Sequence, residues 1–305
     1  MLQEIRGDFL QWLRGFYYVA KNRSVLLAST EMGRNQPAIS HQIKCLEREL
    51  GVILFDRSKG KMELTPEGKK VLKITISIFE LILEMKSETH QRDTELIGEV
   101  AIAATHALIL YYLPAFISNF REKNPLVSFQ LQGGGVEMIV DKVESSEVDF
   151  GMACFESLPK NLYQQELFDT KLKLIAPRGH TYWPQGEITL ELISKAPFIA
   201  FPPTSTISRL INRTFSENGL KLKVIQELNN FEIVKKYVEY GMGVSILDGY
   251  TLTEEDEGKF DIYALDKYFD TRVYSIILRK RKYLSPTALS FLHCVKPNFN
   301  LYFHL

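Results

Sequence analysis

Four polar or basic residues share one face of a helix predicted between residues 36 and 50, and their types suit contact with nucleic acid. They are Gln36, Ser40, His41 and Lys44. A glutamine amide can pair with an adenine edge through two hydrogen bonds, and a serine hydroxyl can bond a base or a phosphate. A lysine ammonium adds a salt-dependent attraction to the phosphate backbone. The alternative is an ordinary solvated helix face. The surrounding sequence has to distinguish a DNA-binding helix from this alternative.

The other face of this helix carries apolar residues at the spacing that one buried side requires. These are Ala38, Ile39, Ile43, Leu46 and Leu50. Asn35 suits the N-cap, and Pro37 is tolerated in the first turn because its missing N–H would have no helical acceptor there. Gly51 follows the last apolar position and is a typical helix end. We expect the apolar residues to pack against neighbouring helices.

Other segments frame this helix and give it a context. Residues 9–20 and 24–32 are predicted to be shorter amphipathic helices. Residues 54–65 contain two short apolar runs around a turn at 58–60, which predicts a β-hairpin. Three helices followed by a hairpin form a winged helix-turn-helix, a fold that presents one helix to the DNA major groove. We expect this all-α domain with its wing over residues 1–65.

Residues 66–95 are predicted to form a linker helix with two apolar stripes. A helix that is apolar on two sides needs two partners, and we expect these to be its own N-terminal domain and a second subunit. About 27 residues at ~1.5 Å each would give a rod of roughly 40 Å. The stripe that we assign to dimerisation contains Leu72, Ile76, Phe79 and Leu83. The alternative is a buried helix of a larger domain.

Composition and charge restrict the class of protein. The 305 residues have a net charge of zero, yet residues 1–70 hold 12 Lys and Arg against 8 Asp and Glu, which suits a nucleic-acid module on an acidic remainder. No apolar leader or membrane span is visible, and three scattered cysteines without a CxxC pair fit a reducing cytoplasm. Neither GxSxG nor a metal-ligand spacing of histidines occurs. We therefore expect no enzyme, no cofactor and no bound metal.

From about residue 96 the pattern changes to alternating strands and helices. Short apolar strands at 99–105, 127–133 and 149–155 are separated by helical segments, and the alternation continues to residue 295. Units of the βαβ type form parallel sheets with crossover helices. The second half of the chain is therefore expected to be an α/β domain.

Within residues 24–68 the sequence resembles the LysR-type transcriptional regulators. The motif positions of that family are occupied here by Ser24, Ala28, Ser29, Met32, Asn35–Ser40, Gln42, Ile43, Leu46, Glu47, Leu50, Gly51, Leu54–Arg57, Leu64, Thr65 and Gly68. The stretch YVEYGMGVSIL at 237–247 resembles the effector-domain signature of the same family. Departures from the family pattern at Leu26, Leu27, Arg34 and His41 concern the strength and sequence preference of DNA binding.

The resemblance implies a DNA-binding transcriptional regulator that is modulated by a small-molecule effector. The helix at 36–50 would be the recognition helix, with Pro37 beside its polar residues at the major groove. Arg57 and Lys59 of the wing would contact phosphate. The implied partners are double-stranded DNA, RNA polymerase, the effector and further copies of the chain in a homotetramer, with no membrane involved.

The resemblance also implies a two-lobed, periplasmic-binding-protein-like effector domain over residues 96–305. Lobe I would comprise 96–157 and 269–305, and lobe II 158–268. Ligands of such folds bind between the lobes, where strand ends and helix N-termini converge.

Two hydroxyl clusters and one glycine fit a ligand site between the lobes. They are Thr105 with His106, then Gly134, and then Thr204, Ser205 and Thr206. Backbone N–H groups and hydroxyls there suit a small anion such as a carboxylate or sulfate. Plain helix capping explains the same hydroxyl residues and stays open as an alternative. The Thr105–His106 pair resembles the family branch that regulates cysteine biosynthesis and sulfur assimilation.

Two alternative functions stay open. One is a regulator of the same fold that senses oxidants, in which Cys154 or Met152 would carry the response. The simpler explanation for Cys45, Cys154 and Cys294 is that they are incidental or buried thiols. The other alternative is a cytosolic α/β ligand-binding protein with an accessory helical domain and no affinity for DNA.

Overall fold

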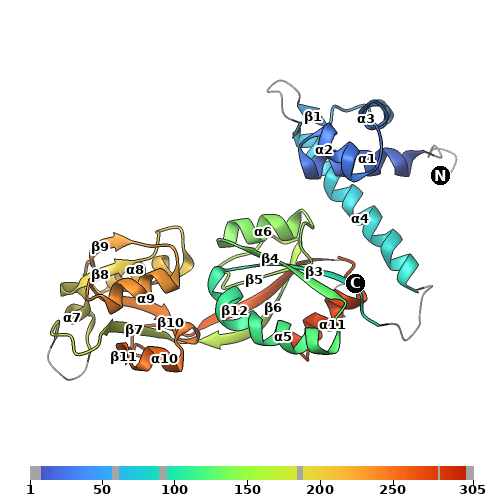
Figure 1. The fold of residues 1–305 in the computed structure, drawn as a ribbon. Coiled ribbons are helices and arrows are strands. Elements are labelled where there is room, and N and C mark those ends of the chain that lie inside the picture. Colours follow the sequence, from blue (N-terminus) through green and yellow to red (C-terminus); the bar gives the residue numbers. More distant parts are fainter. Residues whose placement is uncertain (1–7, 57–61, 89–94, 184–187, 281, 300–305) are drawn as a thin grey trace. The chain divides into compact units, whose positions relative to one another are not determined.

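The computed structural model describes residues 8–56, 62–88, 95–183, 188–280 and 282–299, apart from the side chains of residues 80, 83, 84 and 86–88. The chain divides into two compact units, Met1–Asp93 with Arg281–Tyr283, and Thr94–Lys280 with Leu284–Leu305. The first unit is mainly helical, and the second combines sheets and helices (Figure 1).

The first unit contains a winged helix-turn-helix, as expected from the sequence. Its elements are α1 (Phe9–Asn22), α2 (Val25–Glu31), α3 (Gln36–Leu50), β1 (Phe55–Asp56) and β2 (Glu63–Leu64). Asn35 caps α3 by accepting the N–H of Ala38 at 2.9 Å, and Gly51 ends the helix in the left-handed conformation at φ 67°. The strands β1 and β2 pair antiparallel and form the base of the wing.

The core of this unit lies between α1 and α3. Phe16, Val19, Ile39 and Leu46 are fully buried there. Apolar burial of this kind is the main force that holds such a small domain together. It also fixes α3 with its apolar side inward, so that the polar side is left for solvent or a ligand.

The long helix α4 (Pro66–Glu88) closes the same core. Ile76 is 5 % exposed, and Leu72 and Phe79 are partly buried against the core, with the Phe79 ring 6.1 Å from that of Tyr17. The stripe that the sequence assigns to dimerisation therefore covers the chain's own domain, because α4 lies against α1. The side chain of Leu83 lies outside the described part of the chain.

A different stripe of α4 is left exposed. Ile74, Leu81 and Met85 are 61 %, 64 % and 61 % exposed, at the spacing i, i+7, i+11. This spacing places the three apolar side chains along one side of the helix, as in the seam of a coiled coil.

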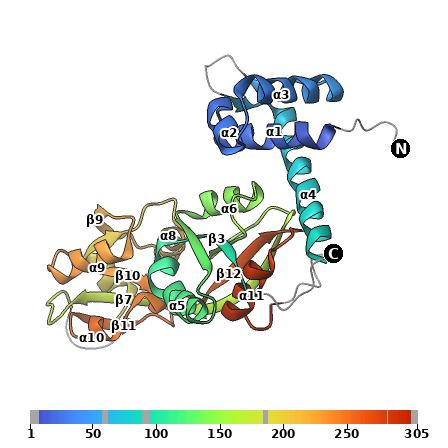
Figure 2. The same ribbon diagram turned by 45° about the vertical axis from the view of Figure 1, so that its right-hand side comes forward.

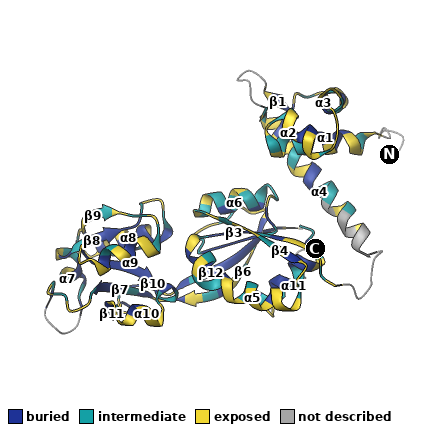
Figure 3. Cartoon of the chain, in the orientation of Figure 1, coloured by how far each residue is buried: buried dark blue, intermediate teal, exposed yellow. Residues whose placement is uncertain are grey.

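Lobe I of the second unit is built on a five-stranded sheet. Its strands are β3 (Gly98–Ala104), β4 (Val127–Gly133), β5 (Phe150–Ala153), β6 (Leu162–Thr170) and β12 (Arg272–Arg279), in the order β4-β3-β5-β12-β6. β3 is parallel to β4 and β5, whereas β12 runs antiparallel to β5 and β6. The central strands are buried on both faces (Figure 3).

Helices cover both faces of this sheet. They are the π-helix η2 (Leu108–Tyr112), α5 (Leu113–Lys123), α6 (Val136–Glu144) and α11 (Pro286–Val295). η2, α5 and α11 pack on one face, and α6 packs on the other (Figures 1 and 2). This double cover explains why β3 and β5 are continuous apolar runs in the sequence.

Lobe II has its own core and two small sheets. Its strands are β7 (Leu172–Pro177), β10 (Ser245–Asp248) and β11 (Phe260–Ala264) in the order β10-β7-β11, with the parallel pair β8 (Pro197–Ala200) and β9 (Lys223–Glu227) beside them. Its helices are α7 (Leu190–Lys195), α8 (Thr206–Glu217), α9 (Phe231–Glu239), η3 (Gly249–Thr251) and α10 (Glu254–Glu257). The two-lobed α/β architecture expected from the sequence is confirmed.

The first boundary between the lobes differs from the expectation. Lobe II was expected to begin at residue 158, but β6 pairs along its length with β12 and belongs to the sheet of lobe I. The chain therefore passes into lobe II between Thr170 and Leu172. β6 was not predicted because its sequence, LYQQELFDT, has three polar residues in succession and shows neither a continuous apolar run nor a strict alternation of apolar and polar residues.

Candidate DNA-binding surface and interlobe site

The exposed face of α3 presents the residues that the sequence singles out for DNA contact. Gln36, Pro37, His41 and Lys44 are exposed, and Ser40 is half-buried. They project from the side opposite the buried residues Ile39 and Ile43, so one helix face carries all of them. Arg57 and Lys59 of the wing lie outside the described residues.

A cysteine holds two of the basic side chains of α3 along the helix. Cys45 Sγ lies 3.7 Å from the His41 ring nitrogens and accepts from Arg48 Nη2 at 3.6 Å. Arg48 is exposed one turn after Lys44 and was not singled out from the sequence. Its basic character became relevant only when the structure placed it beside His41 and Lys44.

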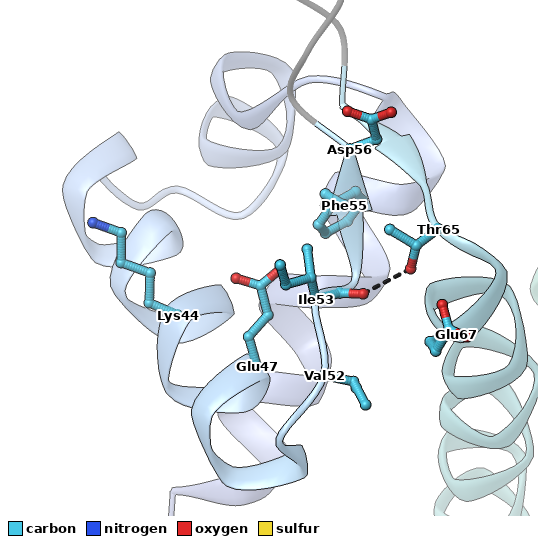
Figure 4. Close-up of a pocket in the computed structure, with 8 residues that line it drawn as sticks. All are labelled: Lys44, Glu47, Val52, Ile53, Phe55, Asp56, Thr65 and Glu67. Carbon is cyan, nitrogen blue, oxygen red and sulfur yellow. Dashed lines mark hydrogen bonds between the residues drawn. The ribbon is translucent and has the colours of Figure 1, made fainter.

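A hollow of about 900 Å³ lies beside the C-terminal half of α3 (Figure 4). It is lined by Lys44, Glu47, Val52, Ile53, Phe55, Asp56, Thr65 and Glu67. Because three carboxylates and one ammonium line it, this surface does not suit a phosphate backbone. Among the described residues, the polar N-terminal part of α3 is therefore a better candidate for DNA contact than this hollow, with Lys44 at the border between the two.

Hydrogen bonds beneath this hollow tie the wing to the start of α4. The Thr65 hydroxyl donates to the Ile53 carbonyl at 2.7 Å and accepts the N–H of Gly68 at 2.9 Å. A Cβ atom on Gly68 would collide with the Leu54 carbonyl oxygen, so the backbones approach each other as closely as a glycine permits.

The two lobes of the second unit meet around a buried ion pair. Arg272 at the start of β12 donates from Nε to Asp248 Oδ1 at 2.8 Å, and Asp248 is the last residue of β10. Tyr274 donates its hydroxyl to Asp248 Oδ2 at 2.8 Å, and Arg272 Nη2 donates to Thr206 Oγ1 at 3.1 Å. All four residues are buried. This network joins β12 of lobe I to β10 and α8 of lobe II.

The electrostatics of the network favour the charged form of the Arg272 guanidinium. Burial is the largest single influence on the pKa of Arg272 and lowers it, but the Asp248 carboxylate, together with Tyr274 and Cys154, outweighs burial and raises the pKa above its ordinary value. Burial and the same carboxylate raise the pKa of Tyr274, so its hydroxyl remains a donor. Arg272 and Asp248 were not selected from the sequence, although a charged residue at the end of an apolar strand was a visible signal.

Two buried hydroxyls next to the network have no well-formed hydrogen bond within the described part of the chain, although each lies near other hydroxyls of the same region. They are Thr105 Oγ1, just after β3, and the Tyr250 hydroxyl, in η3. Burial, followed by the Asp248 charge, raises the pKa of Tyr250, and the Tyr274 and Thr105 hydroxyls partly offset that rise. A buried polar group without a partner costs free energy, and a ligand that bonds to it would recover that cost.

The second-lobe residues expected at the ligand site make contacts within the chain, and their contact with a ligand stays a prediction. The Ser205 hydroxyl caps α8 by accepting the N–H of Ser208 at 3.2 Å, and the exposed Thr204 contributes its carbonyl to Arg209. Thr206 is bound to Arg272.

The first-lobe residues from the same set lie at a strand end. His106 is exposed, and a Cβ atom on Gly133 would lie 2.7 Å from its ring. Gly134 donates its N–H to the Ala104 carbonyl at 3.1 Å, and a Cβ atom there would collide with Met138. Of the expected set, only Thr105 and Thr206 lie in or beside the buried network.

A second hollow of about 310 Å³ lies between the lobes, next to α6 and the start of α8. Glu156 and Arg209 cross it with an ion pair of 3.1 Å, and both side chains are about half exposed. An exposed pair of this kind contributes little to stability because water screens it.

The thiol of Cys154 lies close to the network but is poorly suited to redox sensing. Burial is the main cause that raises its pKa, and the Arg272 charge only partly opposes this. Redox sensing needs an accessible thiolate, whereas this thiol is held in its protonated form. Met152 is fully buried in the core.

The described residues contain no group of three or more His, Cys, Asp or Glu side chains that could hold a metal ion. Among those residues, no helix is both long enough and apolar enough to span a lipid bilayer.

Together, an exposed helix-turn-helix face and a separate two-lobed domain with a buried polar site define a regulator that binds DNA and a ligand. The bacterial regulatory helix-turn-helix family of lysR type matches residues 10–69, and the LysR substrate binding domain matches residues 93–300. The chain belongs to the LysR-type transcriptional regulators.

Comparison with individual proteins agrees with this assignment. The chain is 30 % identical over 289 residues to a probable RuBisCO transcriptional regulator of Porphyra purpurea, covering 92 % of this chain and 91 % of the relative. It is 25 % identical to the regulator CysB of Burkholderia cenocepacia, covering 92 % and 91 %. The fold matches a full-length variant of OxyR from Pseudomonas aeruginosa with a TM-score of 0.79 at 20 % identity, covering 94 % of each chain.

We predict that Asp248→Asn lowers the free energy of unfolding of the second unit by about 3–5 kcal/mol, because it leaves the Arg272 charge buried and unpaired. Glu156→Gln is the matched control, since it removes one carboxylate from an exposed ion pair and should cost less than about 1 kcal/mol. Urea denaturation of the full chain followed by tryptophan fluorescence measures both values. Equal effects of the two substitutions would contradict a charged, buried network at the lobe junction.

Proposed function

We propose that this protein is a sequence-specific transcriptional regulator whose promoter binding responds to a small anionic effector between the lobes. The observation that carries the DNA-binding part is the single exposed face of α3 with Gln36, Ser40, His41 and Lys44. A glutamine on a recognition helix reads base edges, whereas a lysine neutralises phosphate. RNA polymerase is a further partner by analogy with the family.

The proposed regulon follows the relatives. Several further relatives, besides that of Porphyra purpurea, are described as RuBisCO transcriptional regulators at 26–30 % identity. We propose the RuBisCO operon as a target, and genes of cysteine biosynthesis, suggested by the resemblance of the Thr105–His106 pair to that branch of the family, as the second candidate. Binding to the two upstream regions from the same genome distinguishes them.

We predict that Gln36→Ala costs about 1–3 kcal/mol of binding to the preferred site and relaxes its sequence, because a base contact is lost. Lys44→Ala should weaken binding to all sequences and lower the salt slope by about 1. Selection from a random duplex library, followed by fluorescence anisotropy at two salt concentrations, measures both effects.

The matched control for these DNA-binding variants is Lys123→Ala, which removes an exposed lysine from lobe I. This substitution should leave both the selected sequence and the salt slope unchanged. The proposal fails if the wild-type chain enriches no sequence even at low salt.

The interlobe site supports the effector part of the proposal. Arg272 uses two of its five N–H groups on Asp248 and Thr206 within the described structure, and the Thr105 and Tyr250 hydroxyls have no well-formed hydrogen bond there. Asp248 balances the charge of Arg272, so the site has little net charge with which to attract an anion. The effector would therefore be selected mainly by hydrogen bonds from Arg272, Thr105 and Tyr250 to its oxygen atoms. Small carboxylates, sulfate and sugar phosphates have such oxygens.

We expect a bound effector of this class to raise the melting temperature of the full chain by a few degrees at saturating concentration. Thr105→Val with Tyr250→Phe should abolish the shift, because both hydroxyls are removed. Thr181→Val, at an exposed position, is the matched control and should retain the shift. Differential scanning fluorimetry against a panel of the three ligand classes makes the measurement, and a shift that survives the double substitution would place the site elsewhere.

We also propose that α4 mediates dimerisation through Ile74, Leu81 and Met85, which are exposed apolar side chains on one side of this helix. Exposed apolar edges on β9, at Val224 and Ile225, support a second contact between effector domains and hence a homotetramer.

Leu81→Lys with Met85→Lys should halve the molar mass of the assembly, because two lysines would have to be buried against a partner helix. Leu26→Lys with Leu27→Lys is the matched control, since it also converts two exposed leucines to lysines but lies on α2. Size-exclusion chromatography with light scattering gives the masses. An unchanged mass after the α4 substitutions would rule out this seam.

A further inference from the structure

A buried lysine of lobe II is held by three acceptors, one of which comes from lobe I. Lys235 Nζ on α9 donates to Asp256 Oδ2 at 2.7 Å and lies 3.1 Å from Glu232 Oε1, both in lobe II. Its third contact is the Tyr111 hydroxyl of η2, at 2.9 Å. An ammonium has three N–H donors, so these acceptors saturate it. The side chain of Lys235 is 6 % exposed.

The part of this cluster that belongs to lobe II is preassembled. The carboxylate of Asp256 also accepts the N–H of Thr253 at 2.8 Å in the capping box of α10, which fixes it in place. Lys235 would therefore remain paired with its carboxylates if the lobes separated. Only the contact with Tyr111 would break, and it combines the hydrogen bond with an ammonium placed 4.7 Å from the centre of the Tyr111 ring.

Tyr111 reaches Lys235 from an unusual turn. η2 is a π-helix, which contains more residues per turn than an α-helix and is often found at functional positions. It starts three residues after Thr105, whose carbonyl accepts the N–H of Ile109 at 3.2 Å. The turn therefore lies directly between the Thr105 hydroxyl and the contact with lobe II.

The neighbouring residue connects the same turn to the strands that join the lobes. The Tyr112 ring stacks on Phe168 of β6 at 4.6 Å, and Phe168 stacks on Tyr274 of β12 at 5.2 Å. Tyr250, whose hydroxyl has no well-formed hydrogen bond within the described residues, packs edge-on against Tyr274 at 5.0 Å. A continuous set of packed rings thus extends from η2 to the interlobe site.

We propose that Tyr111 and Lys235 form a latch that holds the two lobes together, and that the π-helix η2 links this latch to the interlobe site. Its consequence for regulation rests on the proposed effector-responsive function, but the latch itself can be measured without effector or DNA. The exposed pair Glu156–Arg209 also crosses between the lobes, yet water screens it and it should hold them only weakly.

The test is hydrogen–deuterium exchange of the ligand-free full-length protein with Tyr111→Phe, which keeps the ring and removes the hydroxyl acceptor. Hydrogen bonds to charged groups are the stronger class, so we expect exchange to accelerate about tenfold in two places at once. These are the lobe I segment 105–113 and the lobe II segment 249–257. Arg209→Gln should leave both segments within about twofold of wild type.

The matched control is Tyr268→Phe, which removes a hydroxyl that donates to the Ile188 carbonyl at 3.0 Å inside lobe II. It should change exchange only around its own contact. Acceleration by Tyr111→Phe that is confined to α9 and α10 would overturn the latch, because it would show a local role of the hydroxyl in lobe II. Unchanged exchange in both segments would overturn it as well, whatever the outcome of the DNA and effector measurements.

Discussion

The organisation of the effector domain depends on the buried pairing of Arg272 with Asp248. Two charges removed from water stabilise a fold only when each has its partner and its remaining hydrogen bonds are satisfied. Here the partners come from β12 of lobe I and β10 of lobe II, with Tyr274 and Thr206 completing the set. β12 is therefore joined to β10 and α8 at this one point of the lobe junction. The hydroxyls of Thr105 and Tyr250, which carry no charge, lie in the same buried region.

The DNA-binding domain is the part that the sequence predicts best. The reason is that its determinants are local: Asn35 and Gly51 set the ends of α3, and the apolar spacing sets its buried side. The same reasoning placed Gln36 and Lys44 on the exposed face. Arg48 was not predicted because its relevance depends on Cys45, whose sulfur contacts both Arg48 and His41.

The fold class of the effector domain could be predicted from the sequence, but its strand boundaries and buried contacts could not. The reason is that the residues in contact are distant from one another in the sequence. β6 was missed as an edge strand, and the boundary of lobe II moved with it. The apolar stripe of α4 with Ile76 was assigned to a partner subunit because a sequence pattern shows that a side is apolar without showing what covers it. Ser205 caps α8, the alternative that its residue type allows equally well, and its contact with a ligand stays a prediction.

The close approach of Gly68 to the Leu54 carbonyl, with the Thr65 hydroxyl bonded to Ile53, has a mechanical consequence. At Gly68 the backbone of the first turn of α4 lies directly against the segment that connects α3 to β1. This contact between α4 and the helix-turn-helix is therefore rigid. A rotation of α4 about its axis would therefore be transmitted to the recognition helix α3 with almost no loss. Under the proposed dimerisation through α4, the same helix would also set the angle at which each subunit meets its half of the operator.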